Sequence, residues 1–287
     1  MLNKHIRDIV NLLLYGGAFI GLCAACITAL TFELAGRVDD NLSYILLIGS
    51  ATAALYSAHR VIGLQKVSHV RSHERYSVIR QYKQHIWAYF FVWLGLTIWF
   101  LIPLWNVTFV LWLIPGGVIA VTYVMPFLSG GRRLRDLGWV KILLIGWSWA
   151  WLTAFLPAYY FSEISMHLSV IIGIERLLFI VAITIPFEIR DLKIDQSVGL
   201  VTMPARFGLK RSIWWGRIMC ALVVILSMLL SFHFFDPDYV ISMFLICVMT
   251  IWVLQKSSVI TDDYFFSGVT DGLMILALVV YWILEML

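Results

Sequence analysis

Residues 184–208 decide the fold of this chain, and they read Thr-Ile-Pro-Phe-Glu-Ile-Arg-Asp-Leu-Lys-Ile-Asp-Gln-Ser-Val-Gly-Leu-Val-Thr-Met-Pro-Ala-Arg-Phe-Gly. A long apolar segment precedes them. Three carboxylates then follow at spacings of three and four residues: Glu188, Asp191 and Asp195. This spacing places all three acids on one face if the helix continues. Acids that crowd one face at the end of a membrane segment repel each other and are costly to dehydrate.

A divalent cation with oxygen ligands offsets such a cost, which makes the three acids candidate ligands for Mg²⁺. Basic residues are interleaved with the acids and follow them: Arg190, Lys193, Arg206, Lys210 and Arg211. An acidic face for Mg²⁺ among cationic side chains suits a diphosphate, which needs both. The stretch therefore predicts a metal-dependent site for a diphosphate substrate.

Composition sets the class of protein. Of the 287 residues, 61% are hydrophobic and 13% are charged, whereas soluble domains have about 45–50% and about 25%. The chain is therefore expected to be an all-α, polytopic membrane protein, folded as a single domain over residues 1–287. Its net charge of +4 is interpreted as a signal of membrane topology, and no nucleic-acid partner is expected.

Nine apolar segments are each near the roughly 20 residues that cross about 30 Å of hydrocarbon. The expected spans are about 9–36, 41–63, 85–105, 107–127, 138–161, 167–188, 212–234, 239–255 and 264–287. With nine spans, all but two of the 21 Lys and Arg residues lie in the N-terminal segment or in loops on the same side of the membrane. The positive-inside rule then predicts a cell (inner) membrane protein with a cytoplasmic N-terminus and an outer C-terminus.

Three long loops on the predicted cytoplasmic face hold most of the polar residues: 64–84, 128–140 and 189–211. One reading of their basic residues is that they determine the topology and contact anionic lipids, and the other is that they bind a ligand. Lys141 follows the basic residues Arg132, Arg133 and Arg135. Its side chain could reach a bound phosphate or extend to the membrane surface, and both readings remain open.

Residues 184–208 resemble the second aspartate-rich motif of the UbiA-type intramembrane prenyltransferases. The similarity includes the downstream residues Gly199, Thr202, Pro204, Arg206 and Gly208. Tyr123 and Pro126, with the basic loop and Lys141 after them, resemble the connection between the fourth and fifth helices of that family. Asp271-Gly272 resembles a part of its ninth helix.

The resemblance implies nine helices around a central cavity that opens to lipid, with the site on the cytoplasmic side. It also implies that Asp191 and Asp195 are catalytic and hold Mg²⁺ on a prenyl diphosphate, with Glu188 beside them. Lys141, Arg206, Arg132 and Tyr123 are then expected to contact the diphosphate. The partners implied are membrane lipid, a prenyl diphosphate and a lipophilic acceptor.

The first aspartate-rich motif of the family is missing here. Its place, residues 54–66, reads Ala-Leu-Tyr-Ser-Ala-His-Arg-Val-Ile-Gly-Leu-Gln-Lys, with no acid between Asp40 and Glu74. One reading is that Arg60 and Lys66 neutralise the diphosphate directly. The other is that Arg60 pairs with the acidic face of a protein that has lost catalysis. Both readings remain open.

Two functions therefore compete. The first is Mg²⁺-dependent transfer of a prenyl group from its diphosphate to an aromatic or other lipophilic acceptor. In that case Tyr56, Trp147, Trp149 and Trp151 could shelter a carbocation, although packing and lipid contact explain them as well. The alternative is a non-catalytic UbiA-like protein that binds an isoprenoid or lipid, or scaffolds a partner.

One further pair, Glu175 and Arg176, lies inside the sixth span. Sequence neighbours do not face each other on a helix. Each of these side chains is therefore expected to find its partner on another helix.

Overall fold

A computed structural model describes residues 4–38, 41–66, 79–127, 129, 132–197 and 199–287, and the side chains of 4–9 and 63–66 lie outside that description. Within this part of the chain the elements are helices and no β-strand occurs. The expected all-α class is confirmed. The helices divide into two compact units, Met1–Ala25 with Leu42–Asn106 and Cys26–Asn41 with Val107–Leu287.

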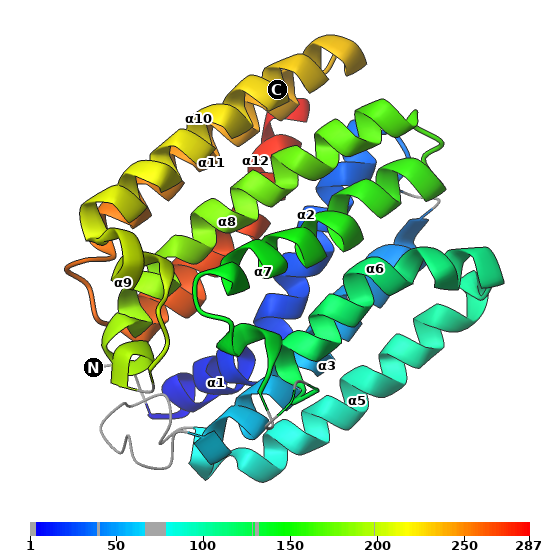
Figure 1. Cartoon of the computed structure of the whole chain (residues 1–287). Helices are drawn as coiled ribbons and strands as arrows, with labels where there is room; N and C mark the ends of the chain where they lie inside the picture. The colour runs from blue at the N-terminus through cyan, green and yellow to red at the C-terminus, as the bar shows by residue number, and fades with distance from the viewer. Residues whose placement is uncertain (1–3, 39–40, 67–78, 128, 130–131, 198) are drawn as a thin grey trace. The chain divides into compact units, whose positions relative to one another are not determined.

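The first unit is built around a helical pair (Figure 1). It contains α1 (Lys4–Tyr15), the first half of α2 (Ala18–Leu34), α3 (Leu42–Lys66), α5 (Lys83–Leu101) and η2 (Ile102–Leu104). Helices α3 and α5 pack along each other. Tyr15, Val61, Ile79 and Ile86 form a buried apolar cluster in this unit, which holds the end of α1 against the pair.

A single first span was expected over residues 9–36, but the helix breaks between α1 and α2. Gly17 has φ +86°, a backbone conformation that glycine adopts without the steric cost of a side chain. An added Cβ there would lie 2.4 Å from the Ala53 carbonyl oxygen. The turn therefore lets the chain reverse into close contact with α3.

The second unit contains residues 184–208, and its longest helix carries the three acids of that stretch. Its elements are the second half of α2, α6 (Val107–Val124), η3 (Leu134–Asp136), α7 (Val140–Ala150), η4 (Trp151–Phe155), η5 (Pro157–Phe161), α8 (Met166–Ser197), α9 (Met203–Phe207), α10 (Leu209–Phe234), α11 (Pro237–Lys256), η6 (Phe265–Thr270) and α12 (Asp271–Glu285). Helix α8 packs against α7 and α10, and α11 packs against α10 and α12 (Figure 1).

Helix α8 differs from the prediction at its end. A loop was expected from residue 189, but the helix continues for 32 residues to Ser197. The three acids are therefore helical. Hydrophobicity ends at Glu188, whereas helix formation requires only satisfied backbone groups and tolerates charged side chains outside the hydrocarbon. The helix consequently carries the acids beyond its apolar part.

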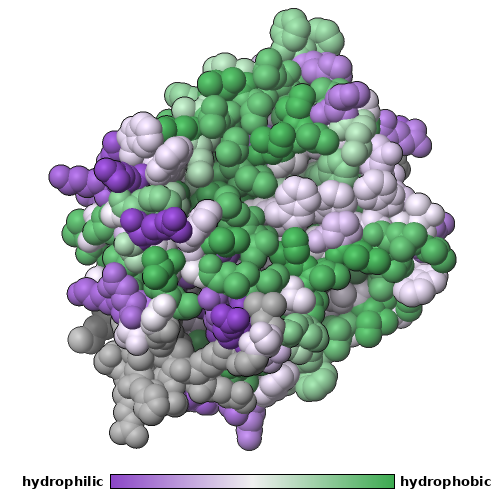
Figure 2. Space-filling view, in the orientation of Figure 1, coloured by the Kyte–Doolittle hydropathy of each residue, from purple (hydrophilic) through white to green (hydrophobic). Residues whose placement is uncertain are grey.

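Eight helices among the described residues are long and apolar enough to cross a membrane. The shorter apolar helix Ala18–Leu34 is 17 residues long, so the count of nine spans stays a prediction. Figure 2 shows apolar side chains over most of the visible face, with hydrophilic ones gathered toward the ends of the helices. This is the surface of a polytopic membrane protein.

The pair inside α8 has its partners on other helices, as predicted. Arg176 donates hydrogen bonds to the Ile27 carbonyl oxygen at 2.5 Å and to Thr31 Oγ1 at 3.2 Å. Glu175 Oε1 accepts a hydrogen bond from Ser227 Oγ at 3.0 Å. These contacts join α8 to α2 and α10 within the second unit.

Candidate functional site

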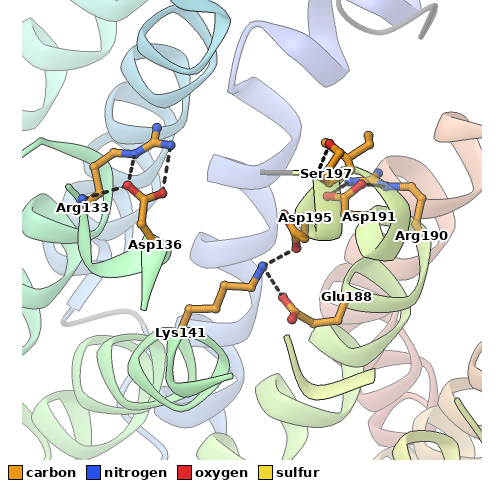
Figure 3. A network of polar contacts seen from close by, with 9 residues as sticks. Arg133, Asp136, Lys141, Glu188, Arg190, Asp191, Asp195 and Ser197 are labelled. Carbon is orange, nitrogen blue, oxygen red and sulfur yellow. Dashed lines mark hydrogen bonds and ion pairs between the residues drawn. The ribbon is translucent and has the colours of Figure 1, made fainter. Parts of the chain in front are cut away.

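The end of α8 meets the start of α7 at one buried lysine. Lys141 Nζ lies 3.0 Å from Glu188 Oε1 and 2.8 Å from Asp195 Oδ2. Figure 3 shows the lysine side chain reaching from α7 to these two acids on α8. All three residues are buried, with exposed fractions of 4–6%. The two carboxylates lie two helical turns apart on one face, and a single ammonium joins them.

Apolar packing fixes this arrangement. Ile142, the residue after Lys141, belongs to a buried cluster with Ile185 and Ile189 of α8 and Met203 of α9. The lysine and its two acids therefore extend from helices that are already held together. The packing therefore fixes the backbone positions from which the lysine and the acids extend.

The third acid, Asp191, has a different partner. Arg190 binds it with two hydrogen bonds, Nε to Oδ1 at 2.8 Å and Nη2 to Oδ2 at 3.0 Å. The same guanidinium reaches Asp263 Oδ1 at 3.3 Å and lies over the rings of Phe187 and Phe266. Arg190 thus ties the acidic end of α8 to the segment that leads into η6.

An ion pair within the basic loop before α7 stabilises its conformation. Arg133 and Asp136 form an ion pair at 3.2 Å, and the backbone N–H of Arg133 donates to Asp136 Oδ2 at 3.0 Å. Burial lowers the pKa of the Arg133 guanidinium, as does the charge of Arg135, while Asp136 acts in the opposite direction. Arg133 therefore stabilises the loop itself, whereas Arg132 beside it is exposed.

This loop packs against the segment that follows α8. Gly138 lies so close to Val201 that an added Cβ would be 2.6 Å from the Val201 carbonyl oxygen. Arg206 of α9 lies over the Trp139 ring at 5.3 Å. Two basic segments far apart in the sequence thus meet beside the lysine and its acids.

Gly138→Ala is expected to push these segments apart. Gly138 has φ +64° and no room for a methyl group, so strain and collision together should lower the free energy of unfolding by about 1–3 kcal/mol. Gly199→Ala is the matched control, because Gly199 has φ +77° with nothing within 4 Å of an added Cβ. Equal losses in thermal unfolding of the two variants would contradict the close contact.

The predicted site residues are distributed unevenly. Tyr123 lies within electrostatic reach of Lys141, Glu188, Asp195 and Arg135. Arg206 is exposed above Trp139, and the exposed Arg132 donates to the Ser129 carbonyl oxygen at 3.4 Å.

The remaining two belong to the first unit. Arg60 donates to the Leu14 carbonyl oxygen and lies over the Tyr15 ring at 5.2 Å. The side chain of Lys66 lies outside the described residues. The roles proposed for both residues stay predictions.

The acidic face as folded does not fit a Mg²⁺ ion. Among the described residues no group of three or more His, Cys, Asp and Glu side chains could hold a metal. An ammonium already lies between Glu188 and Asp195, and a guanidinium binds both oxygens of Asp191. The metal-binding and catalytic roles predicted for these acids therefore stay predictions.

Two contributors were missed by the reasoning from sequence. Asp263 pairs with Arg190, and Trp139 supports Arg206. Asp262 and Asp263 are adjacent acids just before an apolar span, which is the signal that could have identified the first of them. Nothing in the sequence distinguishes Trp139 from the other tryptophans.

Comparisons with known proteins give matches only at the level of structure. No protein-family model and no curated protein matches the chain. A UbiA homolog from Aeropyrum pernix K1 superposes with a TM-score of 0.67 at 18% identity, over 94% of this chain and 98% of that one. A UbiA homolog from Archaeoglobus fulgidus gives 0.64 at 12%, over 96% and 100%. The chain has the UbiA fold.

Two further solved structures match the chain over nearly its whole length. The Archaeoglobus fulgidus homolog bound to GPP and Mg²⁺ matches with a TM-score of 0.57 at 13% identity, over 96% of this chain and 100% of that one. A digeranylgeranylglyceryl phosphate synthase matches with 0.56 at 14%, over 96% and 98%. At these identities the likeness establishes the UbiA fold alone.

Proposed function

We propose that this chain is an intramembrane prenyltransferase, which binds a prenyl diphosphate and transfers the prenyl group to an aromatic or other lipophilic acceptor. The observation that carries the proposal is the meeting of two basic segments beside Lys141 and the α8 acids, in a chain with the UbiA fold. UbiA homolog structures bound to GPP and to DMAPP with Mg²⁺ support a prenyl diphosphate as the ligand class.

In the proposed reaction the bond between the allylic carbon and the diphosphate oxygen breaks, and the electron pair leaves with the diphosphate. Fixed cations stabilise the charge that develops on that oxygen. Arg206, Arg132 and Tyr123 are the residues proposed to contact the diphosphate. Lys141 is proposed to join them through the third N–H of its ammonium, beyond the two that face Glu188 and Asp195. The acceptor then attacks the allylic cation and loses a proton to a base.

An aromatic ladder in the second unit suits the apolar part of such a substrate. The rings of Trp147, Trp151, Phe155 and Tyr159 follow one another with centroids 4.5–5.8 Å apart. The faces of aromatic rings attract cations. The ladder begins less than two helical turns after Lys141 along the helix axis. We propose that its rings shelter the allylic cation and the chain behind it.

Cations of the chain itself supply the positive charge in the proposed reaction. Mg²⁺ is present in the UbiA homolog structures with GPP and DMAPP, and the resemblance implies the same requirement for Asp191 and Asp195. The acidic face as folded does not fit that ion, because protein cations already bind the acids. Whether binding and diphosphate release need Mg²⁺ is tested by performing the experiment below with and without the ion.

Arg206→Met is expected to weaken binding of geranyl diphosphate about tenfold or more, because a charge-assisted contact contributes about 1.5–3 kcal/mol. Binding to purified protein and release of diphosphate on addition of lipophilic acceptors are measured with and without Mg²⁺. Arg211→Met is the matched control, since Arg211 is also exposed and lies on α10, just beyond α9. Wild-type protein that binds no prenyl diphosphate under either condition would refute the proposed function.

A second function, a non-catalytic protein that binds an isoprenoid or lipid, is favoured by one specific observation. Each of the three α8 acids is already bound by a cation of the protein itself, which suits a stable scaffold. This function predicts that geranyl diphosphate binds but that no acceptor causes release of diphosphate. The experiment above separates it from prenyl transfer.

A further inference from the structure

One buried ammonium neutralises two acids that the sequence assigns to a metal. Lys141 Nζ lies within 3.0 Å of an oxygen of Glu188 and within 2.8 Å of an oxygen of Asp195. An ammonium has three N–H donors and no acceptor, so it can satisfy both acids at once. The position between the two carboxylates is therefore already taken by a positive charge that belongs to the chain.

We propose that Lys141 is the resident counter-ion of this acid pair and takes the place of a divalent cation between Glu188 and Asp195. The resting protein then holds its acidic face without a metal at this position. The two acids need a counter-ion whether or not the chain transfers prenyl groups.

The burial of the cluster explains why a cation is required there. Two carboxylates that face each other out of water destabilise each other's charged forms, and each also loses its hydration. Lys141, Glu188 and Asp195 are all buried, so bulk ions contribute little screening. Without the ammonium the two acids would need another cation or would bind protons.

The tethered lysine has an advantage over an ion from solution. It extends from the first turn of α7, which the buried cluster around Ile142 holds against α8, and so its effective local concentration is high. Mg²⁺ instead loses tightly held water and demands nearly octahedral geometry at about 2.0–2.1 Å. A divalent ion must therefore displace the lysine before it can bind both acids.

The second carboxylate oxygen of Glu188 could be a further ligand for a divalent ion. Glu188 Oε2 is buried and has no hydrogen-bond partner among the described residues. One ammonium against two carboxylates also leaves a net negative charge. Removal of the lysine charge should therefore convert the acid pair into a site that attracts a divalent cation.

The test is a titration of purified protein with Mn²⁺, followed by the electron paramagnetic resonance signal of the free ion and performed without prenyl diphosphate. Lys141→Met is expected to bind one Mn²⁺ at least about tenfold more tightly than wild type, and Lys141→Met with Asp195→Asn to lose it. Lys193→Met is the matched control, because Lys193 is an exposed lysine on α8, the helix that carries the two acids. Wild-type Mn²⁺ binding that Asp195→Asn abolishes would overturn the proposal, as would equal binding by Lys141→Met and Lys193→Met.

A second comparison decides the matter if Lys141→Met does not fold. In that case only wild type, Lys141→Arg and Asp195→Asn are titrated with Mn²⁺. If Lys141 is the counter-ion, all three bind Mn²⁺ equally. Because no substrate is present, failure here says nothing against prenyl transfer. Conversely, absent turnover leaves the Mn²⁺ result unchanged.

Discussion

Arg176→Leu is expected to lower the free energy of unfolding by about 3–5 kcal/mol. Arg176 is fully buried in the middle of α8. Its guanidinium donates to the Ile27 carbonyl oxygen, to Thr31 Oγ1 and, at 3.4 Å, to Thr153 Oγ1. The substitution would release α2 and η4 from α8 and remove the positive charge near the buried Glu175 carboxylate.

The measurement is equilibrium unfolding of the purified protein in mixed detergent micelles. Arg217→Leu serves as the control, because Arg217 is exposed on α10 and surface substitutions usually change stability by no more than about 0.5 kcal/mol. Simultaneous replacement of Glu175 and Arg176 by leucine should recover part of the loss, because it leaves no buried charge without compensation. Similar stabilities for Arg176→Leu and Arg217→Leu would show that the buried contacts contribute nothing.

Lys141→Met is expected to lower the free energy of unfolding by a similar amount, about 3–5 kcal/mol, because it leaves two buried acids facing each other. The triple variant Lys141→Met, Glu188→Gln, Asp195→Asn should recover most of that loss. It removes all three charges and keeps side chains of nearly the same volume, and a buried ion cluster replaced as a whole is often close to neutral.

The same unfolding measurement, in metal-free buffer, checks this result. Lys193→Met controls for the loss of a lysine charge near the acids, since its side chain is exposed. A triple variant no more stable than Lys141→Met alone would mean that the lysine acts through packing of its aliphatic chain and not through its charge.

The sequence predicted a membrane protein and the positions of most of its helices, because both depend on the hydropathy and charge of neighbouring residues. Apolar length and charge placement identified the segments that became α3, α5, α6, α10 and α11 to within a few residues. The break at Gly17 was missed, since a run of apolar residues has the same hydropathy whether or not the helix is continuous. The end of α8 was placed too early because hydropathy reports the edge of the hydrocarbon and not the end of the helix.

The arrangement of the acids could not be read from local properties. The spacing of Glu188, Asp191 and Asp195 predicted one shared face, yet only the first and last meet at Lys141. Asp191 is bound by the neighbouring Arg190 instead. The partner of Asp195 is 54 residues away in the sequence, and no periodicity links positions on different helices.

The length of α8 sets the depth at which its acids lie in the membrane. Its 32 residues extend about 48 Å at about 1.5 Å per residue, whereas hydrocarbon is about 30 Å thick. The part that precedes Glu188 is already long enough to cross, even with an ordinary tilt. Glu188, Asp191 and Asp195 therefore lie beyond the length that crosses the hydrocarbon, at the height of the headgroups, and burial in the protein is what separates Glu188 and Asp195 from water. An allylic cation formed there would be captured by water to give a prenyl alcohol unless the protein excludes it, so the ratio of alcohol to transferred product measures how well the site is sealed.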